Sequence, residues 1–260
     1  YCCEQLTKEG KQVLYINCDA GASDIKKHYA HAREYNYKVI APDAHQGKSA
    51  NDVTEKLKSI TATNMPCKDY VFIFDTLKKF TDVISKAQSK EFYNLLRALT
   101  VQGATICLLG HCNKYKDENG QYIYEGTADL RNDVDNLIYF DSSLNEQTNL
   151  LEVTTRPDKT RADFKPVSFN IDRNNGLKVT PVNSPIPILP DEDKEIISKV
   201  KNAIAEGLTT QTEIINRVKD DLGVGDKKIK ARLNKYSTEP NNVLVKIKTV
   251  KGRGVVYKIA

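Results

Sequence analysis

Short apolar runs alternate with amphipathic segments along the first two thirds of the chain. Continuous apolar runs occupy residues 12–18, 71–74 and 104–110, and a shorter one lies at 37–41. An apolar run of this length that stops at a polar residue predicts a strand of a parallel sheet, buried on both faces. Segments with apolar residues at helical spacing lie between the runs, at residues 22–35, 49–60 and 90–100. This alternation predicts an α/β fold with a mostly parallel sheet and flanking helices.

Three of the predicted strands lead into residues with reactive or ligating side chains, Asp19, Asp75 and His111. The carboxyl ends of parallel strands meet at one edge of a sheet, and open α/β proteins bind their ligands at that edge. A carboxylate there is suited to hold Mg²⁺ through water beside the phosphates of a nucleotide. The alternative for Asp75 is a structural role as the cap of the following helix.

A polar segment, residues 112–125, follows the strand at 104–110. We predict a loop here, and a loop of this length inside a compact domain is usually functional. It carries Lys114, Lys116 and three tyrosines, Tyr115, Tyr122 and Tyr124. Tyrosines in such a loop can stack on the bases of single-stranded DNA. They can equally pack the loop onto the body of the protein.

Further strands are predicted at residues 136–140, 150–154, 167–171 and 177–182, the last two joined by the turn sequence RNNG. The Pro-rich residues 183–190 predict a stiff linker. We therefore predict a larger domain at residues 1–182 and a small domain at residues 191–260.

The small domain has a different pattern, with three helices followed by two strands. This order is typical of a winged helix, whose third helix enters the major groove of DNA. The whole chain has a net charge of +5, but residues 223–260 alone carry 10 basic and 2 acidic side chains, which favours a polyanionic partner. The predicted DNA contacts of this domain are Lys227, Lys228, Lys230, Arg232, Lys235, Lys246, Lys248, Lys251 and Arg253. The alternative is a module that docks on a protein.

Composition and cysteine usage indicate the cellular compartment in which we expect the protein. No apolar run approaches the roughly 20 residues of a membrane span, and the first residues do not have the pattern of a signal peptide. The six cysteines include no Cys-x-x-Cys pair, and Cys18 and Cys107 lie inside predicted buried strands. This usage indicates reduced thiols, so we expect a cytoplasmic protein with no membrane partner.

Four motifs in order give the first 165 residues or so a resemblance to RecA-type ATPases. They are VLYINCD, FIFDTLKKF, LLGHCNK and EGTADLRNDVDN. In this order and spacing they resemble the RepA-like hexameric helicases of plasmids and phages, which are related to the DnaB replicative helicases. The resemblance implies that Asp19 polarises the attacking water, where the family usually has Glu. It also implies that Asp75, with Thr76 beside it, holds Mg²⁺ and ATP, and that His111 senses the γ-phosphate.

A fifth motif, RPDKTR at residues 156–161, resembles the Lys-x-Arg pair that DnaB-type rings insert into a neighbour's ATP site. Lys159 and Arg161 would then neutralise transition-state charge in trans. The alternative is a charged tip of a β-hairpin. The family's phosphate-binding loop, G-x-x-x-x-G-K-[ST], is not found in this chain, and we expect it upstream of residue 1.

The resemblance implies an ATP-driven motor on DNA, most simply a replicative helicase of a plasmid, phage or other mobile element. Such a motor would form a homo-oligomeric ring, expected to be a hexamer, with ATP and Mg²⁺ between subunits. Single-stranded DNA would lie in the pore and duplex DNA at the winged helix. The alternative function is a nucleotide-sensing replication initiator or regulator that does not unwind DNA. A recombination mediator is a third possibility that the sequence does not separate from the first.

Overall fold

The computed structural model describes two compact units, residues 1–137 and 138–260. The described residues are 1–44, 48–116, 122–145, 148–161, 163–183, 189, 191–238, 243–248 and 254–259. Lys251, Arg253 and most of the predicted linker lie outside them. The predicted boundaries at residues 182 and 191 stay a prediction.

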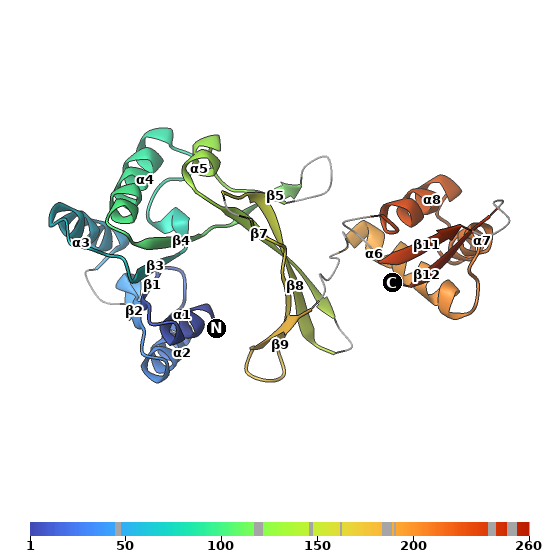
Figure 1. The fold of residues 1–260 in the computed structure, drawn as a ribbon, viewed down its shortest axis with the longest axis horizontal. Coiled ribbons are helices and arrows are strands. Elements are labelled where there is room, and N and C mark those ends of the chain that lie inside the picture. Colours follow the sequence, from blue (N-terminus) through green and yellow to red (C-terminus); the bar gives the residue numbers. More distant parts are fainter. Residues whose placement is uncertain are drawn as a thin grey trace. The chain divides into compact units, whose positions relative to one another are not determined.

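The first unit contains a parallel sheet of four strands in the order β2-β1-β3-β4 (Figure 1). Its strands are β1 (Gln12–Asn17), β2 (Lys38–Ile40), β3 (Tyr70–Asp75) and β4 (Thr105–Leu109). The main helices around it are α1 (Cys2–Lys8), α2 (Ala22–Glu34), α3 (Ala50–Ala62) and α4 (Lys86–Val101), with short turns η1 (Pro42–Ala44) and η2 (Leu77–Lys79). Strands joined by helices on a parallel sheet confirm the predicted α/β fold class.

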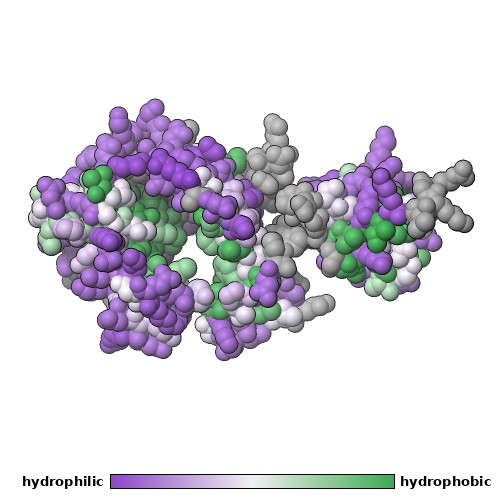
Figure 2. Space-filling model, in the orientation of Figure 1, coloured by the Kyte–Doolittle hydropathy of each residue, from purple (hydrophilic) through white to green (hydrophobic). Residues whose placement is uncertain are grey.

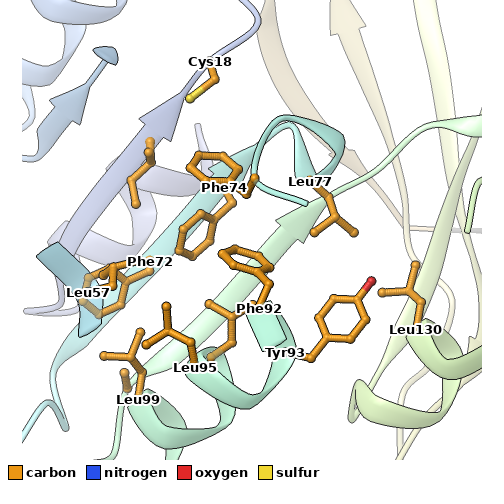
Figure 3. Packing of buried hydrophobic residues seen from close by; sticks show 14 of the residues in the cluster. Cys18, Leu57, Phe72, Phe74, Leu77, Phe92, Tyr93, Leu95, Leu99 and Leu130 are labelled. Atoms are coloured by element: carbon orange, nitrogen blue, oxygen red, sulfur yellow. The ribbon is translucent and has the colours of Figure 1, made fainter. Parts of the chain in front are cut away.

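The central strands β1 and β3 are buried on both faces, as predicted. On one face Val13, Val71 and Ile73 pack against α1 through Cys3 and Leu6. On the other face a larger cluster joins the sheet to α3 and α4 (Figure 3). In it Phe74 is fully buried and meets the rings of Phe80 and Phe92 edge to face. Rings that meet edge to face add stabilisation beyond the area they bury.

The prediction that residues 104–110 form a strand buried on both faces is wrong. The strand β4 exists, but Cys107 is exposed and Leu109 is 39% exposed, whereas Ile106 and Leu108 pack into the larger cluster. Exposed and packed positions alternate along β4, so one face of this edge strand packs on the cluster and the other is open to solvent. Periodicity in the sequence does not distinguish an edge strand from a central one.

The predicted loop at residues 112–125 is instead built on an antiparallel pair, β5 (Cys112–Lys116) and β6 (Tyr122–Tyr124). This pairing was not predicted because the polar composition of the segment is typical of a loop. The intervening residues 117–121 lie outside the described ones. A short helix that we did not predict, α5 (Ala128–Asp133), follows it. Leu130 of this helix is buried in the larger cluster.

The second unit begins with a sheet in the order β10-β9-β8-β7. Its strands are β7 (Leu137–Asn145), β8 (Leu150–Lys159), β9 (Ser168–Asp172) and β10 (Lys178–Val182). Both β7 and β8 extend further than the sequence predicted. Arg156 explains part of this extension, because its Nε donates to Asp141 at 2.7 Å and its guanidinium lies 4.2 Å from the ring centre of Tyr139.

The C-terminal residues form the predicted three helices and two strands: α6 (Asp191–Ala205), α7 (Gln211–Leu222), α8 (Asp226–Lys235), β11 (Leu244–Lys248) and β12 (Val255–Ile259). β11 and β12 pair antiparallel, and Thr210 forms a bridge with Val256. Helix α7 starts at a capping box between Thr210 and Glu213 and ends at Gly223, whose φ of 65° suits glycine.

The core of these helices and strands is mainly apolar, with Val200, Ile214 and Leu233 at 0% exposure. Hydrophilic side chains cover α8, and hydrophobic ones lie over β11 and β12 (Figure 2). Within the described ranges, no helix has the length and apolar character that crossing a membrane requires.

Candidate functional site

The carboxylate of Asp75, at the end of β3, is held by two side chains from β1. The Tyr15 hydroxyl donates a hydrogen bond of 2.5 Å to Oδ2 of Asp75, and Asn17 Nδ2 donates one of 2.9 Å to the same oxygen. Asn17 Nδ2 also donates to the Tyr15 hydroxyl oxygen at 2.8 Å. The parallel register sets Asn17 beside Asp75, and alternation along β1 brings Tyr15 to the same face. Two donors on one oxygen fix the orientation of this carboxylate.

The Tyr15 hydroxyl stays protonated in this arrangement, so it can donate its hydrogen bond to Asp75. Burial raises the pKa of Tyr15 well above the ordinary value for tyrosine, and the hydrogen bond to Asp75 raises it further. The hydrogen bond from Asn17 opposes these effects only in part. The phenol therefore keeps its proton across the neutral and moderately alkaline range, and it continues to donate to Asp75.

Asn17 also shapes the turn that follows β1. Its Oδ1 accepts hydrogen bonds from the backbone N–H groups of Asp19, at 3.1 Å, and Ala20, at 2.8 Å. Asn17 is only 3% exposed, whereas Asp19 is exposed. An asparagine that accepts from the residues after it forms a side-chain turn that fixes the local backbone. Asn17 therefore sets the direction in which the chain carrying Asp19 leaves the sheet.

Thr76 and His111 lie at the same edge of the sheet. Thr76 is 2% exposed, and its hydroxyl donates to the carbonyl oxygen of Leu109 at 3.0 Å, which joins the ends of β3 and β4. The peptide bond between Asp75 and Thr76 is cis. His111 is exposed, and its carbonyl oxygen accepts from the N–H of Glu125 at 2.9 Å, at the base of the β5–β6 pair. The roles of Thr76 and His111 toward a nucleotide stay predictions.

The thiol pKa of Cys18, the residue between Asn17 and Asp19, is shifted by burial and by the charged groups at this edge. Burial raises the pKa of the Cys18 thiol to about 12. The nearby carboxylate of Asp43 raises it, Lys79 lowers it, and the carboxylates of Asp75 and Asp19 raise it further. Asp43 lies in η1, and the sequence analysis did not single it out. Three carboxylates with one lysine nearby make this edge negative, as a cation site requires.

The donor set at this edge fits a hydrated Mg²⁺ ion better than a directly coordinated metal. Among the residues that the structure describes, no group of three His, Cys, Asp or Glu side chains is arranged to hold a metal ion. Within the same residues, Oδ1 of Asp75 accepts no hydrogen bond, whereas Oδ2 accepts two. Mg²⁺ usually keeps several waters and takes only one or two carboxylates from the protein, so Asp75 would hold it through Oδ1.

A second candidate site is the cationic surface of α8. Lys227, Lys228 and Lys230 are exposed on the first half of this helix. On β11, Lys248 is exposed, and Lys246 Nζ donates to Asn234 Oδ1 at 2.9 Å. Lys114 is exposed on β5, and Lys116 is the last residue of that strand. These positions leave the predicted DNA contacts open to test.

Arg232 and Lys235 differ from the other cationic residues of α8, because both contact Asp193 of α6. Asp193 is 0% exposed and accepts hydrogen bonds from Arg232 Nε at 2.5 Å, Lys235 Nζ at 3.0 Å and the Tyr236 hydroxyl at 2.6 Å. Burial alone would raise the pKa of Asp193, but the hydrogen bonds from Tyr236, Arg232 and Lys235 outweigh it and lower that pKa. Arg232 and Lys235 thus have a structural role that the sequence analysis missed.

Lys159 and Arg161, the predicted trans-acting pair, belong to the second unit. Lys159 is the last residue of β8, and Arg161 lies two residues beyond it. Their predicted alternative, the tip of a hairpin, needs amending because the motif from Arg156 to Lys159 is part of a strand. Their action in a neighbour's ATP site stays a prediction.

No protein-family model matches the chain, and neither does any curated protein. Among solved structures, the flagellar accessory protein FlaH from Methanocaldococcus jannaschii is similar in fold. It shares 13% sequence identity, with a TM-score of 0.44, over 68% of this chain and 80% of FlaH. A similarity at this level concerns the fold alone.

Proposed function

We propose that this chain is the core of an ATP-driven DNA motor that couples ATP hydrolysis to movement along single-stranded DNA. The observation that carries this proposal is the Asp75 carboxylate, oriented by Tyr15 and Asn17 at the carboxyl edge of a parallel sheet. Asp19 and His111 follow neighbouring strands of that sheet. The motif resemblance of the first 165 residues assigns these three positions to water activation, Mg²⁺ and phosphate sensing.

The proposed division of labour is electrostatic. Phosphoryl transfer requires positioning and charge neutralisation more than covalent chemistry. Oδ1 of Asp75 would hold the hydrated Mg²⁺, which neutralises phosphate charge when it is bound. Asp19 would orient the attacking water, and the exposed His111 would contact the γ-phosphate. Lys159 and Arg161 would supply positive charge from a neighbouring subunit of a hexameric ring.

Single-stranded DNA would contact the β5–β6 pair in this proposal. Tyr115 is 85% exposed and stands beside Lys114 on β5. An exposed ring next to a lysine is the combination that stacks on a base and neutralises its phosphate. Tyr122, on β6, is 44% exposed and would extend the same platform.

The test is ATP hydrolysis by the purified full-length protein. We expect Mg²⁺-dependent hydrolysis that single-stranded DNA stimulates and that chelation of Mg²⁺ abolishes. Hydrolysis would be measured as released phosphate, with and without an oligonucleotide of mixed sequence. The absence of hydrolysis in the presence of both Mg²⁺ and single-stranded DNA would overturn the proposal.

The exposed lysines of α8 predict salt-dependent binding of duplex DNA. Replacing Lys227, Lys228 and Lys230 together with glutamine is expected to weaken binding and to flatten its dependence on salt. Each phosphate contact that is lost should lower the slope of log K against log salt by about 0.9. The measurement is fluorescence anisotropy with a labelled duplex over a series of salt concentrations. The matched control is Lys201→Gln on α6; equal slopes for the triple variant and the wild type would contradict DNA contact by α8.

The alternative function, a replication initiator or regulator, is favoured by one observation. The C-terminal helices and wing have an apolar core of their own, so DNA binding there does not require nucleotide hydrolysis. A regulator would keep its DNA-dependent activity when the sheet-edge carboxylate is neutralised, whereas a motor would lose it.

A further inference from the structure

Asn17 lies between the two acidic residues to which the proposed chemistry assigns roles. Its amide nitrogen donates to Asp75 Oδ2 at 2.9 Å, and its amide oxygen accepts from the N–H groups of Asp19 and Ala20. The side chain is 3% exposed, so water does not compete for these hydrogen bonds. Both ends of one rigid amide are therefore occupied, one by the residue proposed to hold Mg²⁺ and the other by the turn that carries Asp19.

We propose that Asn17 and Tyr15 are positioning residues that fix Asp75 for Mg²⁺, and that Asn17 couples the position of Asp75 to that of Asp19. This inference rests on the proposed function. Neither residue would touch the nucleotide. Tyr15 and Asn17 saturate Oδ2 of Asp75, so that Oδ1 is the oxygen left to face a hydrated cation.

The geometry explains why two donors are needed. A carboxylate with one hydrogen bond can still rotate about its last bond, which is a soft, twofold torsion. Donors from two residues on one oxygen, themselves joined at 2.8 Å, remove that freedom. Groups that orient a metal ligand in this way typically contribute 10- to 100-fold to metal affinity.

The test uses two variants that remove donors without changing size. Asn17→Asp keeps an oxygen that accepts from the turn but replaces the amide donor with a second carboxylate. Tyr15→Phe removes only the hydroxyl. We expect Asn17→Asp to weaken Mn²⁺ binding in the presence of ATP by at least about 10-fold, and Tyr15→Phe to weaken it by a smaller factor. The direct readout is the electron paramagnetic resonance signal of free Mn²⁺.

A matched control separates positioning from general packing. Tyr37 is a partly buried tyrosine packed on the same face of the sheet, and its hydroxyl bonds His31 at 3.0 Å rather than Asp75. Tyr37→Phe is expected to bind Mn²⁺ like the wild type. Far-ultraviolet circular dichroism checks that each variant is folded, and Tyr15→Phe keeps the test decisive if Asn17→Asp does not fold.

The outcomes separate this inference from the proposed function. In one outcome, the wild type binds Mn²⁺ in the presence of ATP and hydrolyses the ATP, but Tyr15→Phe and Asn17→Asp bind Mn²⁺ with the affinity of the wild type. The positioning role is then wrong, and the proposed motor function stands. If the wild type neither binds Mn²⁺ with ATP nor hydrolyses ATP, both proposals fall. Weaker Mn²⁺ binding in both variants, with Tyr37→Phe unchanged, supports the inference.

Discussion

Replacing Asp75 with asparagine is expected to lower ATP hydrolysis by about 100-fold or more, the scale on which single preorganised charges act in phosphoryl and acyl transfer. The asparagine oxygen can still accept from Tyr15 and Asn17, which leaves the amide nitrogen at the position of Oδ1. An N–H donor there repels Mg²⁺ where the carboxylate attracted it. The rate is measured as released phosphate at saturating ATP and single-stranded DNA.

The control for this variant is Asp69→Asn, at the opposite end of the same strand. Asp69 lies just before β3 and forms an exposed ion pair with Lys11 at 3.2 Å, so its loss should leave hydrolysis unchanged.

The same variants separate the two proposed functions. A motor with Asp75→Asn stops unwinding DNA yet keeps duplex binding at α8. If origin binding or repression persists in that variant as the protein's main activity, the regulator is the better description.

The second large effect is expected at Asp193. Asp193→Ala removes the buried acceptor shared by Arg232, Lys235 and Tyr236. Breaking a buried ion pair by deleting one partner costs about 3 kcal/mol at the lower end of the usual range. The lower end applies because the side chains of Arg232 and Lys235 remain 21% and 41% exposed and can reach water. Hydrogen exchange of peptides covering α6 and α8 in the whole protein measures the loss.

Asp220→Ala, on the exposed surface of α7, is the control for Asp193→Ala and should leave hydrogen exchange unchanged.

The dependence of stability on acidic pH tests the role of Asp193 independently. The pKa of Asp193 is lowered in the folded state, so its stabilisation is complete above the unfolded value of about 3.9. That stabilisation is lost as pH falls below 3.9 through the folded pKa. Asp193→Asn should show a weaker acid dependence of exchange in α8; an unchanged dependence would contradict this role.

The strands that lead into Asp19, Asp75 and His111 were predictable because an apolar run with a polar stop is a local signal. The partners of Asp75 were not, since Tyr15 and Asn17 meet it only through the register of β1 against β3. The one available hint was Asn17 itself, a polar residue inside an apolar run. Asp193 was missed because an acidic residue in the first turn of a helix is ordinarily explained by the helix dipole.

The edge position of β4 and the pairing of β5 with β6 were hidden for a different reason. Both depend on which segments lie next to a strand, and hydrophobic periodicity along one strand carries no information about its neighbours. The three C-terminal helices were predicted more completely, since their caps and apolar faces can be recognised one helix at a time. The capping box of Thr210 and Glu213 is an example.

The contacts of Asp193 divide the side chains of α8 into a group that holds the helix to α6 and a group that can be substituted without loss of those contacts. Arg232, Lys235 and Tyr236 tie the helix to α6, while Lys227, Lys228 and Lys230 extend from it without sharing those contacts. Substitutions at the three outer lysines therefore leave the scaffold of the helix intact. A protein built in this way can change its preferred target by exchanging surface residues, and the same separation makes α8 a practical site for engineering new binding specificities.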